Sequence, residues 1–137
     1  MLSQDEKTLF VAESPSSPNE HRQLRAYPIL SNGLLDEYQV LFDFGLFRGI
    51  DGMTLTTEGI ILATAGDNNS GPGPMIYEIE QNGLVRSTHK TPKDAPANCT
   101  FGGSSLDTLF VTFTTGHLFS VSGSGLTGHL LYPSRRF

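Results

Sequence analysis

The chain is poor in several features that would point to common protein classes. It has a single cysteine, Cys99, and no tryptophan among its 137 residues, which excludes an internal disulfide framework and a cysteine-rich zinc site. No apolar run approaches the ~20 residues that a membrane-spanning helix needs. The N-terminus, "MLSQDEKTLFVAES", lacks the basic start and the uninterrupted apolar segment of a signal peptide. We therefore expect a cytoplasmic protein that does not span a membrane, in which Cys99 is a small, partly buried apolar residue.

Basic clusters and common catalytic motifs are also missing. The chain carries 9 basic and 14 acidic side chains, a net charge of −5, and its densest basic cluster is Arg135-Arg136. Nucleic acid is therefore not an expected partner. The absence of a GxSxG elbow and a P-loop leaves serine hydrolase and nucleotidase functions without support. The histidines do not stand at HxH or HExxH spacing, which argues against a histidine-based metal site.

Helical periodicity is absent as well. Apolar residues nowhere recur at helical spacing over ten or more positions. They occur instead in short runs rich in Val, Ile, Phe, Tyr and Thr, and Gly, Pro, Asn and Ser separate these runs. With 15 glycines and 8 prolines, the chain has many turns, and the pattern predicts an all-β fold.

Three of the predicted strands resemble one another. They are "TLFVAE" (8–13), "GIILATA" (59–65) and "TLFVTFT" (108–114), and their starts lie 51 and 49 residues apart. In each copy, a second strand leading to a tight turn and then a third strand follow: 24–34 and 38–44, 75–84 and 84–90, and 117–126 and 127–133. An additional opening strand is expected at 53–57 in the second copy and at 99–103 in the third, whereas the first copy has only Met1-Leu2 at that position.

A period near 50 residues with four short strands per copy is typical of a propeller blade. One small sheet cannot cover both of its faces, so the copies are expected to pack against each other. The sequence predicts one domain over 1–137, a partial β-propeller of about three blades at roughly 1–46, 47–95 and 96–137. A β-sandwich also has many short strands but does not predict the recurrence. Asn32-Gly33 and Asn82-Gly83 are predicted to form type I′ hairpin turns.

Two polar side chains stand at equivalent places in the repeat. Asp51 lies ten residues before Ile61, and Asn98 lies eleven residues before Leu109. Opening strands of propeller blades line the central channel, so both side chains are expected at its mouth. There they would offer oxygen ligands to a hard cation. Turn or capping roles for both residues are the alternative.

Three segments carry a family resemblance. "IDGMTLTTEGIILATAG" (50–66), "IYEIEQNGLV" (76–85) and "PANCTFGGSSLDTLFVTFTTGHLFSV" (96–121) closely resemble the C-terminal half of the senescence-marker-protein/gluconolactonase/regucalcin family. The Asp-Gly-Met and Asn-Cys-Thr-Phe-Gly-Gly motifs, 47 residues apart, are the specific part of the match. The resemblance implies that the chain is half of a six-bladed propeller. It also implies one divalent cation (Ca, Zn, Mn or Mg), held by a Glu, an Asn and an Asp from separate blades.

The same resemblance implies metal-dependent hydrolysis of lactones such as sugar lactones. Asp51 matches the family's metal-binding Asp, which also serves as general base. The family's Glu belongs to an earlier blade and its metal-binding Asn falls just before Met1, so we expect weak cation binding. Asn98 and Asp67, the latter in the Gly- and Asn-rich segment 64–74, are candidate substrate-binding residues, although a plain surface loop is the alternative for 64–74.

Activity is then expected only if the missing ligands come from a partner or a second copy. A homodimer that completes a six-bladed ring is one such route, because a half ring leaves sheet faces exposed at both ends. The alternative is a non-catalytic half-propeller that serves as a structural or binding module.

Overall fold

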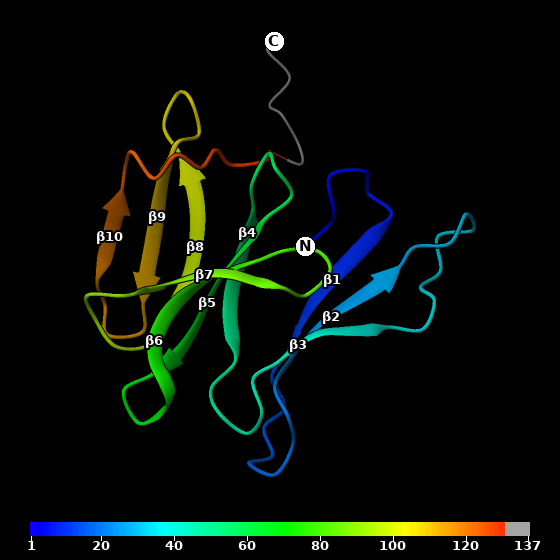
Figure 1. The fold of residues 1–137 in the computed structure, drawn as a ribbon, viewed down its shortest axis with the longest axis horizontal. Coiled ribbons are helices and arrows are strands. Elements are labelled where there is room, and N and C mark those ends of the chain that lie inside the picture. Colours follow the sequence, from blue (N-terminus) through cyan, green and yellow to red (C-terminus); the bar gives the residue numbers. More distant parts are fainter. Residues whose placement is uncertain (131–137) are drawn as a thin grey trace.

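The computed structural model describes residues 1–130, which form ten β-strands and no helix (Figure 1). All strand pairs are antiparallel, and each strand pairs with its neighbour in the sequence. The first sheet contains β1 (Thr8–Glu13), β2 (Gln23–Pro28) and β3 (Gln39–Asp43). The second contains β4 (Ile50–Leu55), β5 (Ile61–Asp67), β6 (Ser70–Ile79) and β7 (Val85–Lys90). The third contains β8 (Pro96–Gly102), β9 (Thr108–Phe113) and β10 (Leu118–Val121).

The all-β prediction is confirmed, and each repeated segment forms a strand of a different sheet: β1, β5 and β9. The residues that begin the first copy also pair as expected from the repeat. Leu2 forms a bridge with Leu9, and the Phe10 N–H donates to the Met1 carbonyl at 2.8 Å. Met1-Leu2 is therefore a short opening piece beside β1.

The last predicted strand, 127–133, takes a different course. Residues 131–133 lie outside the described residues, and the described part does not pair with β10. Gly128 instead forms a bridge with Thr56, and the His129 N–H donates to the Leu55 carbonyl at 2.8 Å. Leu126 packs into the apolar cluster between the second and third sheets, and this packing directs the chain toward β4.

The prediction of type I′ turns is wrong. Only Gly33 and Gly83 have positive φ in their loops, at 81° and 92°, whereas the preceding asparagines do not. The Gly33 N–H donates to the Leu30 carbonyl and the Leu30 N–H to the Leu34 carbonyl, both at 2.8 Å. This is a type I turn followed by a left-handed glycine. Asn32 Oδ1 accepts the Leu34 N–H at 3.0 Å, so the asparagine caps the turn with its side chain and needs no left-handed backbone.

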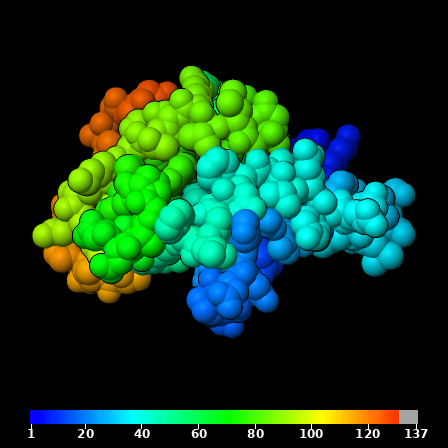
Figure 2. Space-filling view, turned by 60° about the horizontal axis from the view of Figure 1, so that its bottom comes forward, coloured from blue at the N-terminus to red at the C-terminus, as the bar shows by residue number. Residues whose placement is uncertain are grey.

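The same hydrogen-bond pattern recurs in three other loops. They are Thr56–Ile60, Glu80–Leu84 and Phe113–His117, each with glycine in the fourth position. Because each such loop joins two neighbouring antiparallel strands with the same turn, the three sheets share a way of connecting their strands. In the space-filling view the sheets follow one another along the molecule, from blue and cyan through green to orange (Figure 2).

The second sheet is covered on both faces. Side chains alternate across a strand, so Ile61, Ala63 and Ala65 of β5 face the first sheet, together with Phe10 and Leu24. The intervening Leu62 belongs to the cluster shared with the third sheet, which includes Cys99, Phe101, Leu109 and Val111. All six residues from Ile61 to Gly66 are buried, which explains why Thr64 is the only polar residue before the terminal Asp67 of β5.

Within residues 1–130, no helix is present that has the length and apolar character to cross a membrane.

Candidate functional site

Asp51 lies near the start of β4, in a hollow of about 280 Å³ where the first and second sheets meet. Its side chain is 35% exposed. The polar residues that line this hollow are Ser14, Arg22, Arg48, Asp51, Asp67 and Ser70. Two carboxylates and two guanidinium groups therefore share one surface depression, and two hydroxyls accompany them.

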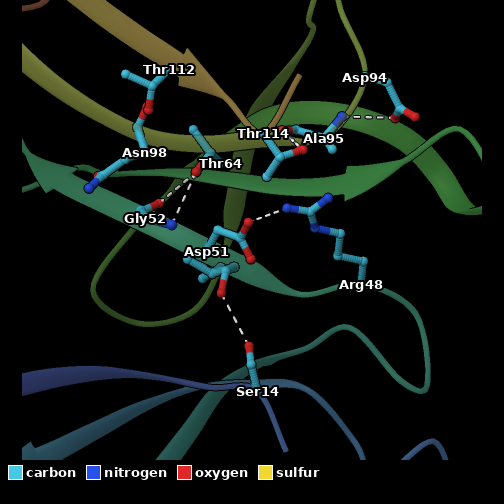
Figure 3. A network of polar contacts seen from close by, with 11 residues as sticks. Ser14, Arg48, Asp51, Gly52, Thr64, Asp94, Ala95, Asn98, Thr112 and Thr114 are labelled. Atoms are coloured by element: carbon cyan, nitrogen blue, oxygen red, sulfur yellow. Dashed lines mark hydrogen bonds and ion pairs between the residues drawn. The ribbon is translucent and has the colours of Figure 1, made fainter. Parts of the chain in front are cut away.

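Arg48 forms an ion pair with Asp51 (Figure 3). The contact joins Arg48 Nη2 to Asp51 Oδ2, and the Arg48 side chain is more buried than its partner, at 23% exposed. The backbone of Arg48 is fixed by the neighbouring strands: its carbonyl accepts the Gly66 N–H at 3.1 Å and its N–H donates to Ser70 Oγ at 3.5 Å. The guanidinium group is thus delivered to Asp51 from a well-anchored residue.

Arg22, the other arginine of the hollow, has a supporting role. Its guanidinium group donates to the carbonyl oxygens of Pro15, Glu20 and Leu46, at 3.2, 2.8 and 3.4 Å. These bonds hold the loop between β1 and β2 against the segment that precedes β4. Gly49 makes this close approach feasible, because a Cβ there would lie 2.6 Å from the Arg22 Cβ.

Asp67 ends β5 and lines the same hollow as Asp51. Its Oδ1 atom accepts the Asn69 N–H at 2.8 Å and the Ser70 hydroxyl at 3.0 Å. The tight connection to β6 depends on these bonds. The adjoining loop is held further by Asp94, whose Oδ1 accepts the Asn68 N–H at 2.8 Å.

Asn98 packs against Gly52, the residue that follows Asp51. A Cβ placed on Gly52 would lie 2.6 Å from the Asn98 Cα and 2.3 Å from its Oδ1. Gly52 is also fixed by Thr64, whose hydroxyl accepts the Gly52 N–H at 3.1 Å and donates to its carbonyl at 3.0 Å (Figure 3). The two motifs separated by 47 residues therefore meet where β4 and β8 pack together.

The side chains of Asp51 and Asn98 nevertheless line different hollows. Asn98 belongs to a depression of about 340 Å³ on the third sheet, with Phe110, Thr112 and Leu118. Its Oδ1 accepts the Cys99 N–H at 2.8 Å. The structure thus brings Asp51 and Asp67 together and leaves Asn98 on the next sheet.

A divalent cation fits only part of this donor set. An exposed carboxylate oxygen is the ligand type that Ca²⁺ and Mg²⁺ prefer, and Asp51 supplies one. Within residues 1–130, however, no group of three or more His, Cys, Asp or Glu side chains is arranged to hold a metal ion. Asp67 Oδ1 already accepts two hydrogen bonds within its own turn, and the positive charge of Arg48 lies beside Asp51. Asp51 can therefore serve as one ligand, and the described residues do not complete a coordination shell.

Cys99 is buried, as the sequence predicted, at 5% exposed. Burial raises the pKa of its thiol from 9.0 to about 12, because the thiolate would lose its hydration. A nucleophilic role at neutral pH is therefore excluded. Among the histidines, His89 pairs with the buried Glu78, Nε2 to Oε1 at 2.7 Å, in an apolar crevice between the second and third sheets.

Sequence reasoning missed Arg48, Ser14 and Ser70. Arg48 stands three residues before Asp51 in a segment without strand periodicity, so only its proximity in sequence could have flagged it. Ser14 donates its hydroxyl to the Ile50 carbonyl at 3.2 Å, beside Asp51 (Figure 3). Ser14 precedes Asp51 by 37 residues, so no local sequence pattern relates these two side chains.

Successive antiparallel sheets packed face to face, with polar residues where β4 meets its neighbours, define a β-propeller-like protein. Residues 1–115 match the family described as SMP-30/Gluconolactonase/LRE-like region. The chain belongs to this family, which confirms the resemblance drawn from the Asp-Gly-Met and Asn-Cys-Thr motifs.

Individual relatives support the assignment. An uncharacterized protein of Sulfolobus acidocaldarius is 29% identical over 115 residues, which cover 82% of this chain and 38% of that protein. A solved luciferin-regenerating enzyme is similar in fold, with a TM-score of 0.77 and 24% identity over 93% of this chain and 45% of the enzyme. The chain thus spans less than half the length of both relatives.

Proposed function

We propose that this chain carries part of the active site of a lactone hydrolase that depends on a divalent cation, and that Asp51 is its cation ligand and general base. The remaining ligands would come from residues outside the chain or from a second copy. Family membership supports the reaction class. The observation that carries the assignment to Asp51 is its position: a carboxylate, 35% exposed, in a polar hollow beside the Gly52–Asn98 contact.

Lactone hydrolysis needs few functional groups. A divalent cation, when bound, supplies Lewis-acid polarisation of the lactone carbonyl. Asp51 orients a water molecule and accepts one of its protons as the oxygen adds to the carbonyl carbon. The ring C–O bond then breaks, and the proton passes to the departing alkoxide, which yields the open hydroxy acid. Ser14, Ser70 and Asp67 line the hollow and can hydrogen-bond to the hydroxyl groups of a sugar lactone.

A second copy is one source of the missing ligands. The outer face of the third sheet carries the open hollow of Asn98, Phe110 and Leu118, and Leu118 is 65% exposed. On the first sheet, Val40 of β3 is 39% exposed. Two copies related by a two-fold axis would cover such faces and close a six-bladed ring. Light scattering over a concentration series tests this: a dimer is expected, and a monomer at every concentration would rule out this route.

A non-catalytic structural or binding module is the second candidate, and one observation favours it. Asp51 is already paired with the positive charge of Arg48. This ion pair needs no cation and can serve only to fix the start of β4. In that case the hollow would bind ligands without turnover.

A hydrolysis assay separates the two candidates. Sugar lactone opening would be followed by proton release with added Ca²⁺, Mn²⁺ or Zn²⁺, with and without chelator. We expect cation-dependent turnover that Asp51→Asn lowers by about 100-fold or more, in the range of a lost general base. Asp107→Asn is the matched control, because Asp107 is an exposed carboxylate of the β8–β9 loop. Turnover that chelator does not affect, or that Asp51→Asn leaves intact, would favour the non-catalytic module.

A further inference from the structure

We infer that Arg48 is a built-in competitor of the cation at Asp51, and that it sets how tightly this chain holds the metal. This inference rests on the proposed function in assigning the cation to Asp51. It concerns a residue that is not itself a ligand, because a guanidinium group has no lone pair to offer.

The charges of the hollow isolate Arg48 as the competing group. Arg22 donates its guanidinium protons to the carbonyls of the surrounding loop. Asp67 uses Oδ1 within its own turn. The ion pair of the hollow is therefore the one between Arg48 and Asp51.

The geometry makes the competition direct. Arg48 Nη2 contacts Asp51 Oδ2, one of the two carboxylate oxygens to which a metal ion could bind. Two positive charges a few ångströms apart repel each other, even where solvent screens them. A cation that binds through Oδ2 must displace the guanidinium group, and one that binds through Oδ1 lies close to its positive charge. In both cases the ion pair weakens metal binding.

The backbone of Arg48 is anchored, so only its side chain has to move when a cation binds. The Gly66 N–H and Ser70 Oγ hold its main chain in place, so release involves rotation of the side chain alone. The side chain is 23% exposed at the open hollow, which leaves it room to turn toward solvent. Replacement of Arg48 therefore alters the charge at Asp51 without removing a backbone support.

The test measures Mn²⁺ binding directly and needs no substrate. Substoichiometric Mn²⁺ broadens the NMR signals of nearby amides, so loss of the Gly52 amide signal reports occupation of Asp51 even when binding is weak. Arg48→Gln, which keeps length and polarity, is expected to tighten Mn²⁺ binding by about fivefold, the size of a partly exposed ion pair. Asp51→Asn in the Arg48→Gln background is expected to abolish the gain.

Arg86→Gln is the matched control. It removes the same charge from an ion pair with Glu58 on the second sheet, where Nη1 and Oε2 lie 3.5 Å apart. An equal gain at Gly52 in Arg86→Gln would reveal a general effect of net charge and overturn the inference. No broadening at Gly52 in Arg48→Gln, or no more than in the parent chain, would overturn it as well.

Binding and turnover can fail separately. Tighter Mn²⁺ binding in Arg48→Gln without lactone opening supports the inference and counts against the proposed function. Cation-dependent turnover that requires Asp51, with Mn²⁺ binding unchanged in Arg48→Gln, supports the function and overturns the inference.

Discussion

Gly52 lies so close to Asn98 that a Cβ on the glycine would sit 2.6 Å from the Asn98 Cα. Because the nearest atoms include backbone, the neighbouring strand would have to shift to admit even a methyl group. We expect Gly52→Ala to lower the free energy of unfolding by about 1–3 kcal/mol, as overpacking does. Urea denaturation measures this, and an unchanged midpoint would contradict the close packing of β4 on β8.

Two turn glycines offer a matched pair of substitutions. Gly33 and Gly83 both have positive φ, 81° and 92°, in loops of the same type. A Cβ on Gly33 meets open space, whereas one on Gly83 would lie 2.1 Å from the Leu41 carbonyl oxygen. Gly33→Ala is expected to cost about 1 kcal/mol, the strain of a left-handed backbone, and Gly83→Ala clearly more. Equal unfolding midpoints for the two variants would show that the contact with Leu41 is not restrictive.

Cys99 should be inert in the folded protein. Its thiol is buried and its pKa is raised from 9.0 to about 12, so we expect no reaction with a thiol reagent at pH 8 until denaturant is added. The raised pKa of the Cys99 thiol also determines how the free energy of unfolding changes with pH. The stabilising contribution of the neutral thiol is full below pH 9.0 and is lost as the pH rises toward about 12, because the unfolded chain releases its proton first. Cys99→Ser, followed by urea denaturation at pH 8 and pH 10, should weaken that slope.

Glu78 depends on its partner, His89. The Glu78 side chain is 11% exposed, and Oε1 lies 2.7 Å from the His89 Nε2 atom, beside Leu62 and Ile76. His89→Leu would leave the buried carboxylate without this partner, and we expect a loss of about 1–3 kcal/mol in the free energy of unfolding. The double variant Glu78→Leu/His89→Leu should recover much of that loss. A double variant no more stable than His89→Leu would contradict the pairing.

Asp67 should affect substrate binding more than turnover. It shares the hollow of Asp51, but its Oδ1 shapes the turn that carries Ser70. If the proposed lactone hydrolysis holds, Asp67→Asn is expected to raise KM severalfold with little change in kcat, since it weakens binding in the ground state and transition state alike. A fall in kcat as large as that of Asp51→Asn would instead give Asp67 a direct part in the reaction.

The sequence predicted the strands well because their signals are local. The short runs rich in apolar and β-branched residues in β1 and β9, the mostly apolar run of β5 and the glycines between strands are each visible within a few residues. The turn type was mispredicted because Asn32 and Asn82 use their side chains to accept backbone N–H groups. Their composition alone does not distinguish this capping from a left-handed backbone.

The candidate site was only partly predictable. Asp51 could be found from its motif, but the strand register gives the repeat position of Asn98 to Gly52, since Gly52 pairs with Thr64 and Asn98 with Thr112. The expected loop over 64–74 is wrong: Asp67 ends β5, and only Asn68-Asn69 separate it from β6. The Arg48–Asp51 ion pair depends on the conformation of the segment before β4. Contacts with Gly49, Gly66 and Ser70 fix this conformation, and no spacing in the sequence predicts them. Residues 127–130 of the predicted strand 127–133 lie beside β4 and do not pair with β10. The sequence did not indicate this, because the packing of Leu126 into the inter-sheet cluster is a tertiary effect.

The burial of both faces of β5 has a consequence for how the molecule opens. Every strand pairs with a neighbour close in sequence, so each sheet can form and melt as a local unit. Amide hydrogens of β5 lie between two apolar layers, so we expect them to exchange only when the second sheet opens together with both of its neighbours, whereas those of the edge strands β3 and β10 should exchange through smaller fluctuations. We therefore expect the slowest-exchanging amides of the described residues in the buried part of β5, "ILATAG" (61–66).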